Sequence, residues 1–177
     1  MNTTHCKCKF YDSWATALGP VGAVAEAGRV VRLILPHGRV RQMLAALAGL
    51  YPRARRDPDT FGHLRDLTRA YFGGRKVDFA DIPCILPPKN TFTGRVLRAC
   101  RKVPYGRTVS YSALAARVGN ARAARAVASA MARNPIPLVV PCHRVIRADR
   151  SLGGFSAEGG VDLKRRMLQL EGIQIAP

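Results

Sequence analysis

Acidic residues are scarce in this sequence. Asp and Glu supply 11 of its 177 residues against 29 Lys and Arg, so the formal net charge is +18 at pH 7. Hydrophobic residues make up 47% and charged residues 23%, a balance that excludes a disordered basic tail and favours a packed core. A folded protein this basic is expected to bind nucleic acid or an anionic membrane surface. The alternative is a solvated basic surface that serves solubility only.

Long hydrophobic runs are also missing. No apolar stretch approaches the roughly 20 residues that cross a bilayer. Lys7, Lys9 and Asp12 interrupt the start of the chain, where a signal peptide would carry its apolar segment. We therefore expect a cytoplasmic protein without a membrane partner.

The cysteines show no pairing pattern. They are five in number and irregularly spaced, so we expect thiols and not a disulfide framework. Cys6 and Cys8 stand one residue apart and, together with His5, His37 and His63, are an alternative metal site. Because they lack a second close Cys or His pair, we expect no metal, and nothing in the sequence requires another cofactor.

The first half of the chain alternates strand and helix patterns. Residues 21–35 predict a β-hairpin, because β-branched residues suited to a sheet follow a turn at Glu26-Ala27-Gly28. Apolar residues at steps of three and four predict amphipathic helices over 40–50 and 61–71. This half is expected to be scaffold, a small sheet with helices against it.

Three prolines between Ile82 and Asn90 end this pattern, since the segment can neither continue a helix nor sit in a central strand. We expect a domain boundary there, with domains at residues 1–88 and 89–177. The second begins with a helix capped by Thr91 or Thr93 and ended before Gly106.

A helix-turn-helix is predicted next. Ser110 caps a short helix that runs to Val118, Gly119 and Asn120 form the turn, and a second helix begins near Arg122. The second helix mixes arginines with alanines, a small and positive surface that can approach a phosphate backbone closely. The alternative is that alanine is only a good helix former and the arginines are solvent charges. The candidate DNA-binding residues are Arg122, Ala124, Arg125, Ala126 and Ala128.

A cysteine stands beside a histidine in the segment NPIPLVVPCHRVI, residues 134–146. Its prolines rigidify the approach to Cys142, and a preorganised loop holds a nucleophile at a fixed angle to its substrate. A thiol is only a few per cent ionised at neutral pH, so a base or positive charge such as His143 or Arg144 is needed nearby. On an extended strand, His143 would reach Cys142 only through a turn or a bridging water. A buried structural cysteine is the alternative.

The longer string narrows these alternatives. The segment NPIPLVVPCHRVI, with GGFS and LKRRMLQLEG after it and FTGRVLRACRKVPYGRTVSYSALAARVGNARAARAVASAM before it, closely resembles the O6-alkylguanine-DNA alkyltransferases. The resemblance covers residues 90–174 and extends loosely into the first half. It implies a ribonuclease-H-like α/β N-terminal domain and a mostly helical, winged-helix-like C-terminal domain. It also implies a suicidal repair reaction on double-stranded DNA containing O6-alkylguanine, and O4-alkylthymine is a further possible substrate.

The resemblance assigns roles residue by residue. Cys142 is the nucleophile that keeps the alkyl group as a thioether, and His143 takes the thiol proton through water. Glu171 orients that histidine, as the third member of a catalytic triad does. Asn134 braces the loop. Tyr111 donates its hydroxyl toward the leaving guanine and helps to turn the nucleotide phosphate, so it is also a DNA-binding residue.

Further roles concern the flipped nucleotide, which must leave the stack before its O6 alkyl group can be attacked. Arg125 fills the gap in the stack, and the second helix enters the minor groove. Ser156 offers its N–H to O6, while the carbonyls of Cys142 and Val145 accept from the exocyclic amine. The substrate-binding residues are Pro137, Val145, Phe155 and Ser156.

One departure affects the pocket. The sequence reads GGFSAEGGVDLK, with Ala157 and Glu158 as two extra residues and Phe155 in place of a frequent tyrosine. The size of the accepted alkyl group is therefore left open. A non-catalytic alkyltransferase-like protein that flips the base without chemistry is the alternative function, although such proteins lack the cysteine. A thiol hydrolase explains neither the helix-turn-helix nor the charge. We expect a monomer.

Overall fold

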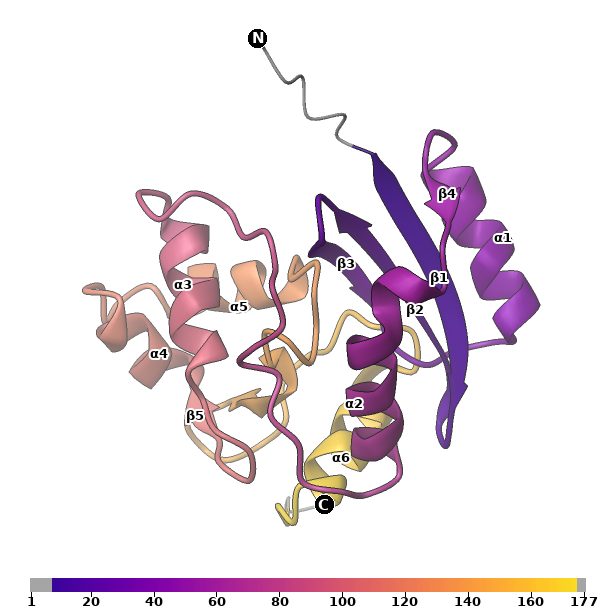
Figure 1. The fold of residues 1–177 in the computed structure, drawn as a ribbon. Coiled ribbons are helices and arrows are strands. Elements are labelled where there is room, and N and C mark those ends of the chain that lie inside the picture. Colours follow the sequence, from indigo (N-terminus) through magenta and orange to yellow (C-terminus); the bar gives the residue numbers. More distant parts are fainter. Residues whose placement is uncertain (1–7, 175–177) are drawn as a thin grey trace, which may run out of the picture.

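A computed structural model describes residues 8–174. Its first half is built on a four-stranded sheet in the order β3-β2-β1-β4 (Figure 1). Strands β1, β2 and β3 form an antiparallel meander, and β4 pairs parallel to β1. The strands are β1 (Lys9–Thr16), β2 (Gly19–Glu26), β3 (Arg29–Ile34) and β4 (Arg55–Arg56). The predicted hairpin is confirmed as β2 and β3, and its turn residues Ala27 and Gly28 both have positive φ.

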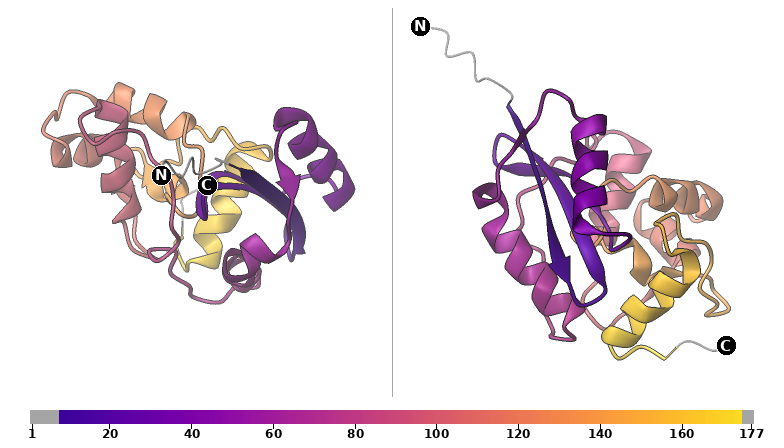
Figure 2. Two further views of the ribbon diagram at one scale, coloured as in Figure 1. Left: turned by 45° about the horizontal axis from the view of Figure 1, so that its top comes forward. Right: turned by 90° about the vertical axis from the view of Figure 1, so that its right-hand side faces the viewer.

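Two helices cover opposite faces of this sheet (Figure 2). Helix α1 (Val40–Leu50) packs Met43 and Leu47 against Val24. Helix α2 (Gly62–Phe72) lies on the other face, after a single turn of 3-10 helix. There the indole of Trp14 donates to the Thr68 hydroxyl at 2.8 Å. Both predicted helices are therefore confirmed, whereas β1 was not predicted.

The proline-rich segment lies along the edge of β3. The Val30 N–H donates to Pro83 O at 2.8 Å, and the Ile85 N–H donates to Val30 O at 2.9 Å. A third bond, from the Leu33 N–H to Pro135 O at 2.9 Å, joins the same strand to the cysteine loop. The segment pairs at a sheet edge, which is the position in a sheet that tolerates proline.

The second half is mostly helical. Thr91 caps α3 (Phe92–Arg101), since its hydroxyl accepts from the Gly94 N–H at 3.0 Å. Ser110 caps the first helix of the helix-turn-helix in the same way through the Ala113 N–H. The remaining elements are β5 (Val109–Ser110), α4 (Tyr111–Arg117), α5 (Ala124–Ala132), the 3-10 helix η2 (Cys142–Arg144), β6 (Val145–Ile146) and α6 (Gly160–Leu170).

The helix-turn-helix is confirmed with a shifted boundary. Helix α5 begins at Ala124, so Arg122 lies in the connecting turn and not in the helix. One hydrophobic core runs from Trp14 in the sheet to Met167 in α6 and so includes both halves of the chain. No helix within residues 8–174 is long and apolar enough to span a bilayer.

Candidate active site

An asparagine fastens the loop that carries Cys142. Asn134 Nδ2 donates to Val140 O at 2.8 Å, and Asn134 Oδ1 accepts from the Ile136 N–H at 3.2 Å. The Cys142 N–H donates to the same Val140 carbonyl at 2.8 Å. The chain then turns through η2 and is not extended, so Cys142 and His143 do not alternate as residues of a strand do.

The Cys142 thiol is nearly enclosed, with 6% of the residue exposed. Burial raises its pKa, while the Asn134 side chain and the positive charge of Lys164 act in the opposite direction without cancelling it. The resting group is therefore the protonated thiol. Because only the thiolate is a strong nucleophile, a base must remove this proton during a reaction.

His143 is the candidate for that base. Its ring is fully buried, and Nε2 lies 2.7 Å from Glu171 Oε1. A carboxylate only accepts, so Nε2 carries the hydrogen and Nδ1 keeps its lone pair. Burial lowers the pKa of His143, which keeps the imidazole neutral. Within the described part of the chain, Nδ1 has no hydrogen-bond partner and can accept a proton.

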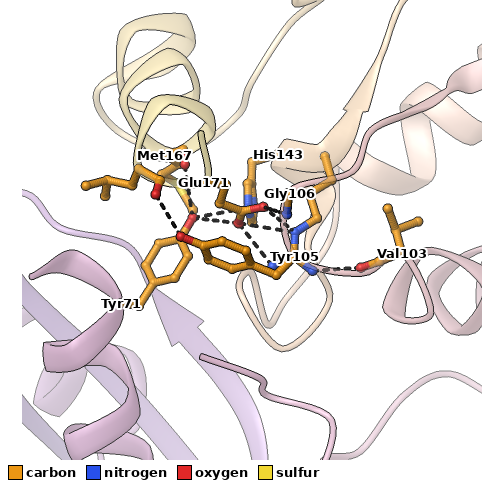
Figure 3. A network of polar contacts seen from close by, with 9 residues as sticks. Tyr71, Val103, Tyr105, Gly106, His143, Met167 and Glu171 are labelled. Carbon is orange, nitrogen blue, oxygen red and sulfur yellow. Dashed lines mark hydrogen bonds and ion pairs between the residues drawn. The ribbon is translucent and has the colours of Figure 1, made fainter. Parts of the chain in front are cut away.

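Glu171 is a buried carboxylate surrounded by donors (Figure 3). Besides His143, it accepts from the Tyr71 hydroxyl at 2.9 Å, from the Gly106 N–H at 3.0 Å and from the Arg144 guanidinium. Burial alone would raise the pKa of Glu171. The hydrogen bonds and charges of His143 and Arg144 outweigh that effect and lower the pKa to about 2. The carboxylate therefore stays ionised and holds the imidazole in one tautomer.

Sequence reasoning missed part of this network. Tyr71 counted only as one of the apolar residues of a helix, and no local signal marks its hydroxyl. Arg144 was a candidate for activating the thiol, but its side chain instead binds Glu171 and donates to Val103 O at 2.7 Å. Both residues meet Glu171 through contacts distant in sequence.

Lys164 is a second residue that the sequence did not reveal. It is completely buried, and Nζ donates to Val145 O at 2.7 Å and to Leu152 O at 2.5 Å. Burial lowers its pKa to about 8, and its charge favours the Cys142 thiolate. Since a carbonyl has two lone pairs, Val145 O can still accept from a ligand.

Cys142 lines two cavities. The larger, of about 490 Å³, extends to β3 and includes His37, Pro137 and Glu158 in its wall. The smaller, of about 300 Å³, lies against α5 and is lined by Tyr111 and Ala128. Both cavities are also lined by Met131, Ala132, Phe155 and Ser156. The thiol thus faces the helix-turn-helix on one side and the sheet on the other.

The loop over residues 153–160 is fastened at two points. The Ser156 hydroxyl donates to Ala132 O at 2.7 Å. Glu158 lies 3.2 Å from Nε2 of His37, which follows β3. The exposed Glu158 carboxylate is thus directed toward the sheet half of the chain. At the other end of the loop, Gly153 has positive φ and would bring a Cβ to 3.1 Å from the Tyr111 hydroxyl, so it allows that ring to approach.

Of the candidate DNA-binding residues within 122–128, only Ala128 lines a cavity at Cys142. Arg122, Arg125 and Ala126 are exposed, whereas Ala124 and Ala128 are half-buried on α5. Among residues 8–174, no three His, Cys, Asp or Glu side chains are grouped so as to hold a metal ion. His5 and Cys6 of the alternative metal site lie outside the described residues.

Comparisons with known proteins agree with this combination of fold and site. The family model for the 6-O-methylguanine DNA methyltransferase DNA-binding domain matches residues 91–173. A methylated-DNA–protein-cysteine methyltransferase of Metallosphaera sedula is 36% identical over 165 residues, which cover 93% of this chain and 94% of that protein. A DNA base-flipping protein of Thermus thermophilus is 42% identical over 127 residues, covering 70% of this chain and 82% of that protein.

A solved structure resembles the whole chain. The crystal structure of Mycobacterium tuberculosis OGT in complex with DNA matches with a TM-score of 0.76 at 32% identity and covers 92% of this chain and 93% of that one. A mixed sheet with helices, a helix-turn-helix and an enclosed cysteine define the class as DNA-repair proteins of the alkyl-transfer type. The chain belongs to the methylated-DNA–protein-cysteine methyltransferase family.

Proposed function

We propose that this protein repairs double-stranded DNA by moving an alkyl group from O6 of guanine to Cys142, once per molecule. The observation that carries the proposal is the Cys142 thiol between two cavities, beside a neutral His143 with a free lone pair on Nδ1. The proposal extends to O4-alkylthymine as a possible second substrate.

Residues of this chain would carry out the transfer as follows. The thiol proton passes through water to Nδ1 of His143, and Glu171 stabilises the imidazolium that forms. The Cys142 sulfur then bonds the alkyl carbon, the bond from that carbon to O6 breaks, and its electron pair remains on guanine. The Tyr111 hydroxyl donates a hydrogen bond to the guanine ring and stabilises the departing anion, which then takes a proton from solvent. Burial raises the pKa of Tyr111, so the hydroxyl stays protonated and can make this hydrogen bond.

The two cavities would hold different parts of the substrate. The smaller cavity, against α5, would take the flipped guanine, with the Ser156 N–H and the carbonyls of Cys142 and Val145 as polar partners. The larger cavity would take the alkyl group, against Pro137 and Phe155. A smaller, mostly apolar cavity beside Tyr111 suits a base, while a larger cavity suits a substituent of variable size.

DNA binding is assigned to α5 in the minor groove. Arg125 would fill the gap that the flipped nucleotide leaves in the base stack, and Arg122 would contact phosphate. The small side chains of α5 would allow close approach to the DNA, and they are Ala124, Ala126 and Ala128. The net charge of +18 supports a search along undamaged DNA, since phosphate contacts carry affinity but do not identify a lesion.

We also propose that the chain forms two domains. Residues 1–88 would form a ribonuclease-H-like α/β domain, supported by the antiparallel meander with a fourth parallel strand. Residues 89–177 would form a winged-helix-like domain, supported by α4, α5 and the β5-β6 pair. We expect the protein to act as a cytoplasmic monomer without metal or cofactor.

Mass spectrometry tests the transfer. Incubation with a duplex containing O6-methylguanine should add one methyl group per protein, on the peptide that carries Cys142. Cys142→Ala should still bind that duplex without becoming methylated. Cys100→Ala, which changes a fully buried cysteine on α3, is the matched control and should still accept the methyl group. An unmodified thiol in folded protein that binds the duplex would contradict the proposal and support the base-flipping alternative.

A further inference from the structure

A tyrosine from the sheet half of the chain reaches the catalytic centre. Tyr71 lies near the end of α2, is 1% exposed, and places its hydroxyl 2.9 Å from Glu171 Oε1 (Figure 3). The edges of neighbouring rings fix its position, with the Phe72 centroid at 5.1 Å and the Tyr105 centroid at 6.4 Å. The packing of α2 and of these rings therefore holds the hydroxyl at Glu171, beside the ring of His143 at a centroid distance of 6.2 Å.

The direction of the hydrogen bond follows from the neighbours of the hydroxyl. Tyr71 Oη is 3.3 Å from both Met167 O and His143 Nε2. His143 Nε2 already carries a hydrogen, and the Met167 carbonyl is the more distant acceptor. The Tyr71 hydroxyl thus donates its hydrogen bond to Glu171. Burial and the charge on Glu171 raise the pKa of Tyr71, so the hydroxyl keeps this proton.

Three side chains donate to one oxygen atom. Glu171 Oε1 accepts from Tyr71 Oη at 2.9 Å, from His143 Nε2 at 2.7 Å, and from Arg144 through Nη2 at 3.0 Å and Nε at 3.2 Å. This is the oxygen that stabilises His143 when the ring takes a proton. Each additional donor draws charge from it and restricts its direction.

We infer that Tyr71 is a positioning residue for alkyl transfer, because its hydroxyl shares Glu171 Oε1 with His143, orients that ring and limits its basicity. This inference rests on the proposed function. Tyr71 lines neither cavity at Cys142, so it acts through Glu171 and not on the substrate. The N-terminal half would then supply part of the catalytic geometry besides serving as scaffold.

Tyr71→Phe removes one of the groups that act on His143 and keeps the charged groups around the ring. Loss of its donor leaves more charge on Glu171 Oε1, which favours the protonated ring and raises the pKa of His143. Since transfer needs the neutral ring, the acid limb of the rate profile should move to higher pH. The groups that act on the ring are Tyr71, Arg144, Lys164 and Glu171.

Single-turnover transfer from the O6-methylguanine duplex tests this inference across the pH range. For Tyr71→Phe, the acid limb should move up by about half a pH unit, and the plateau rate should fall roughly threefold to tenfold as the ring loses its orientation. Tyr105→Phe is the matched control, because that hydroxyl donates to Leu170 O at 2.7 Å. Its acid limb should stay in place.

Two further measurements make the test independent of a folding defect or of the reaction itself. Site-specific 3-fluorotyrosine at position 71 keeps the ring and makes the hydroxyl a stronger donor, so the acid limb should move to lower pH. An NMR titration of the His143 ring nitrogens should show the same opposite shifts without any DNA. If wild-type protein fails to accept the methyl group, the proposed function fails, while this titration still decides the role of Tyr71.

Three results would overturn the inference. The first is a His143 titration that is unchanged in folded Tyr71→Phe protein. The second is an equal shift in Tyr105→Phe, which would indicate a general effect of ring substitution. The third is a shift in the same direction for phenylalanine and for 3-fluorotyrosine at position 71.

Discussion

His143 Nε2 lies 2.7 Å from Glu171 Oε1, and neither side chain has any exposed surface. The pair joins η2 to the residue that follows α6, so the catalytic turn and the C-terminal helix are fixed to each other. Folding thereby buries one ring that must be neutral and one carboxylate that must be ionised.

Acid should weaken the fold through this pair. The pKa of His143 is lowered from 6.5, and that of Glu171 is lowered from 4.5 to about 2. The unfolded chain therefore binds more protons, and the stability from both groups is present in full above pH 6.5 and is lost as the pH falls. Urea midpoints should decrease below pH 6.5 because of His143, and again between 4.5 and about 2 because of Glu171. Equal midpoints at neutral and acidic pH would contradict this.

Removing the arginine that pairs with Glu171 should be costly. Arg144→Met leaves a buried carboxylate without its main cation, and such a loss typically costs about 3–5 kcal/mol. Arg165→Met is the matched control, because its pair with Asp162 is exposed and should contribute about 1 kcal/mol or less. Chemical denaturation of both variants measures the difference. Similar losses in the two variants would show that Glu171 does not depend on Arg144.

The buried lysine should control the reactivity of the thiol. Lys164→Met removes the positive charge that favours the Cys142 thiolate, so the rate of modification by iodoacetamide at neutral pH should fall roughly threefold to tenfold. Lys102→Met changes an exposed lysine and serves as the control. A rate that is equal in wild type and Lys164→Met would show that the charge does not reach the sulfur.

The loop with two extra residues should limit the size of the adduct. His37 lies 2.9 Å from Leu35 O through Nδ1 and 3.2 Å from Glu158 through Nε2. Glu158→Gln weakens this attachment, and the ratio of benzyl to methyl transfer rates should rise by roughly threefold. Asp162→Asn, an exposed acid on α6, should leave the ratio unchanged. A lower ratio in Glu158→Gln would contradict the expectation.

Elements with a local signature could be predicted from the sequence. The hairpin has Gly28 at its turn, where φ is positive, and the helix-turn-helix has the Ser110 cap and the Gly119 turn. Strand β1 lacks such a signature, because its central residues are buried in succession and Asp12 lies among them. A strand covered on both faces shows no alternation of polar and apolar residues.

Only some residues of the site could be predicted from the sequence. Cys142, His143 and Glu171 could be named because a continuous motif surrounds them, although their catalytic roles remain predictions. Tyr71 and Lys164 could not be named, since each joins the site through packing of distant segments. A tyrosine in an apolar helical stripe and a lysine in a basic helix look ordinary until the fold brings them to the centre.

The proline-rich segment that lies along β3 also affects solution behaviour. Its bonds to Val30, with that from Leu33 to Pro135, occupy backbone groups that an edge strand would otherwise offer to another chain. At the opposite edge, β4 is only two residues long, and both are exposed arginines. A sheet with one edge covered and the other short and charged resists aggregation by strand pairing. Copies of this highly charged protein can therefore bind DNA side by side without pairing through their sheet edges.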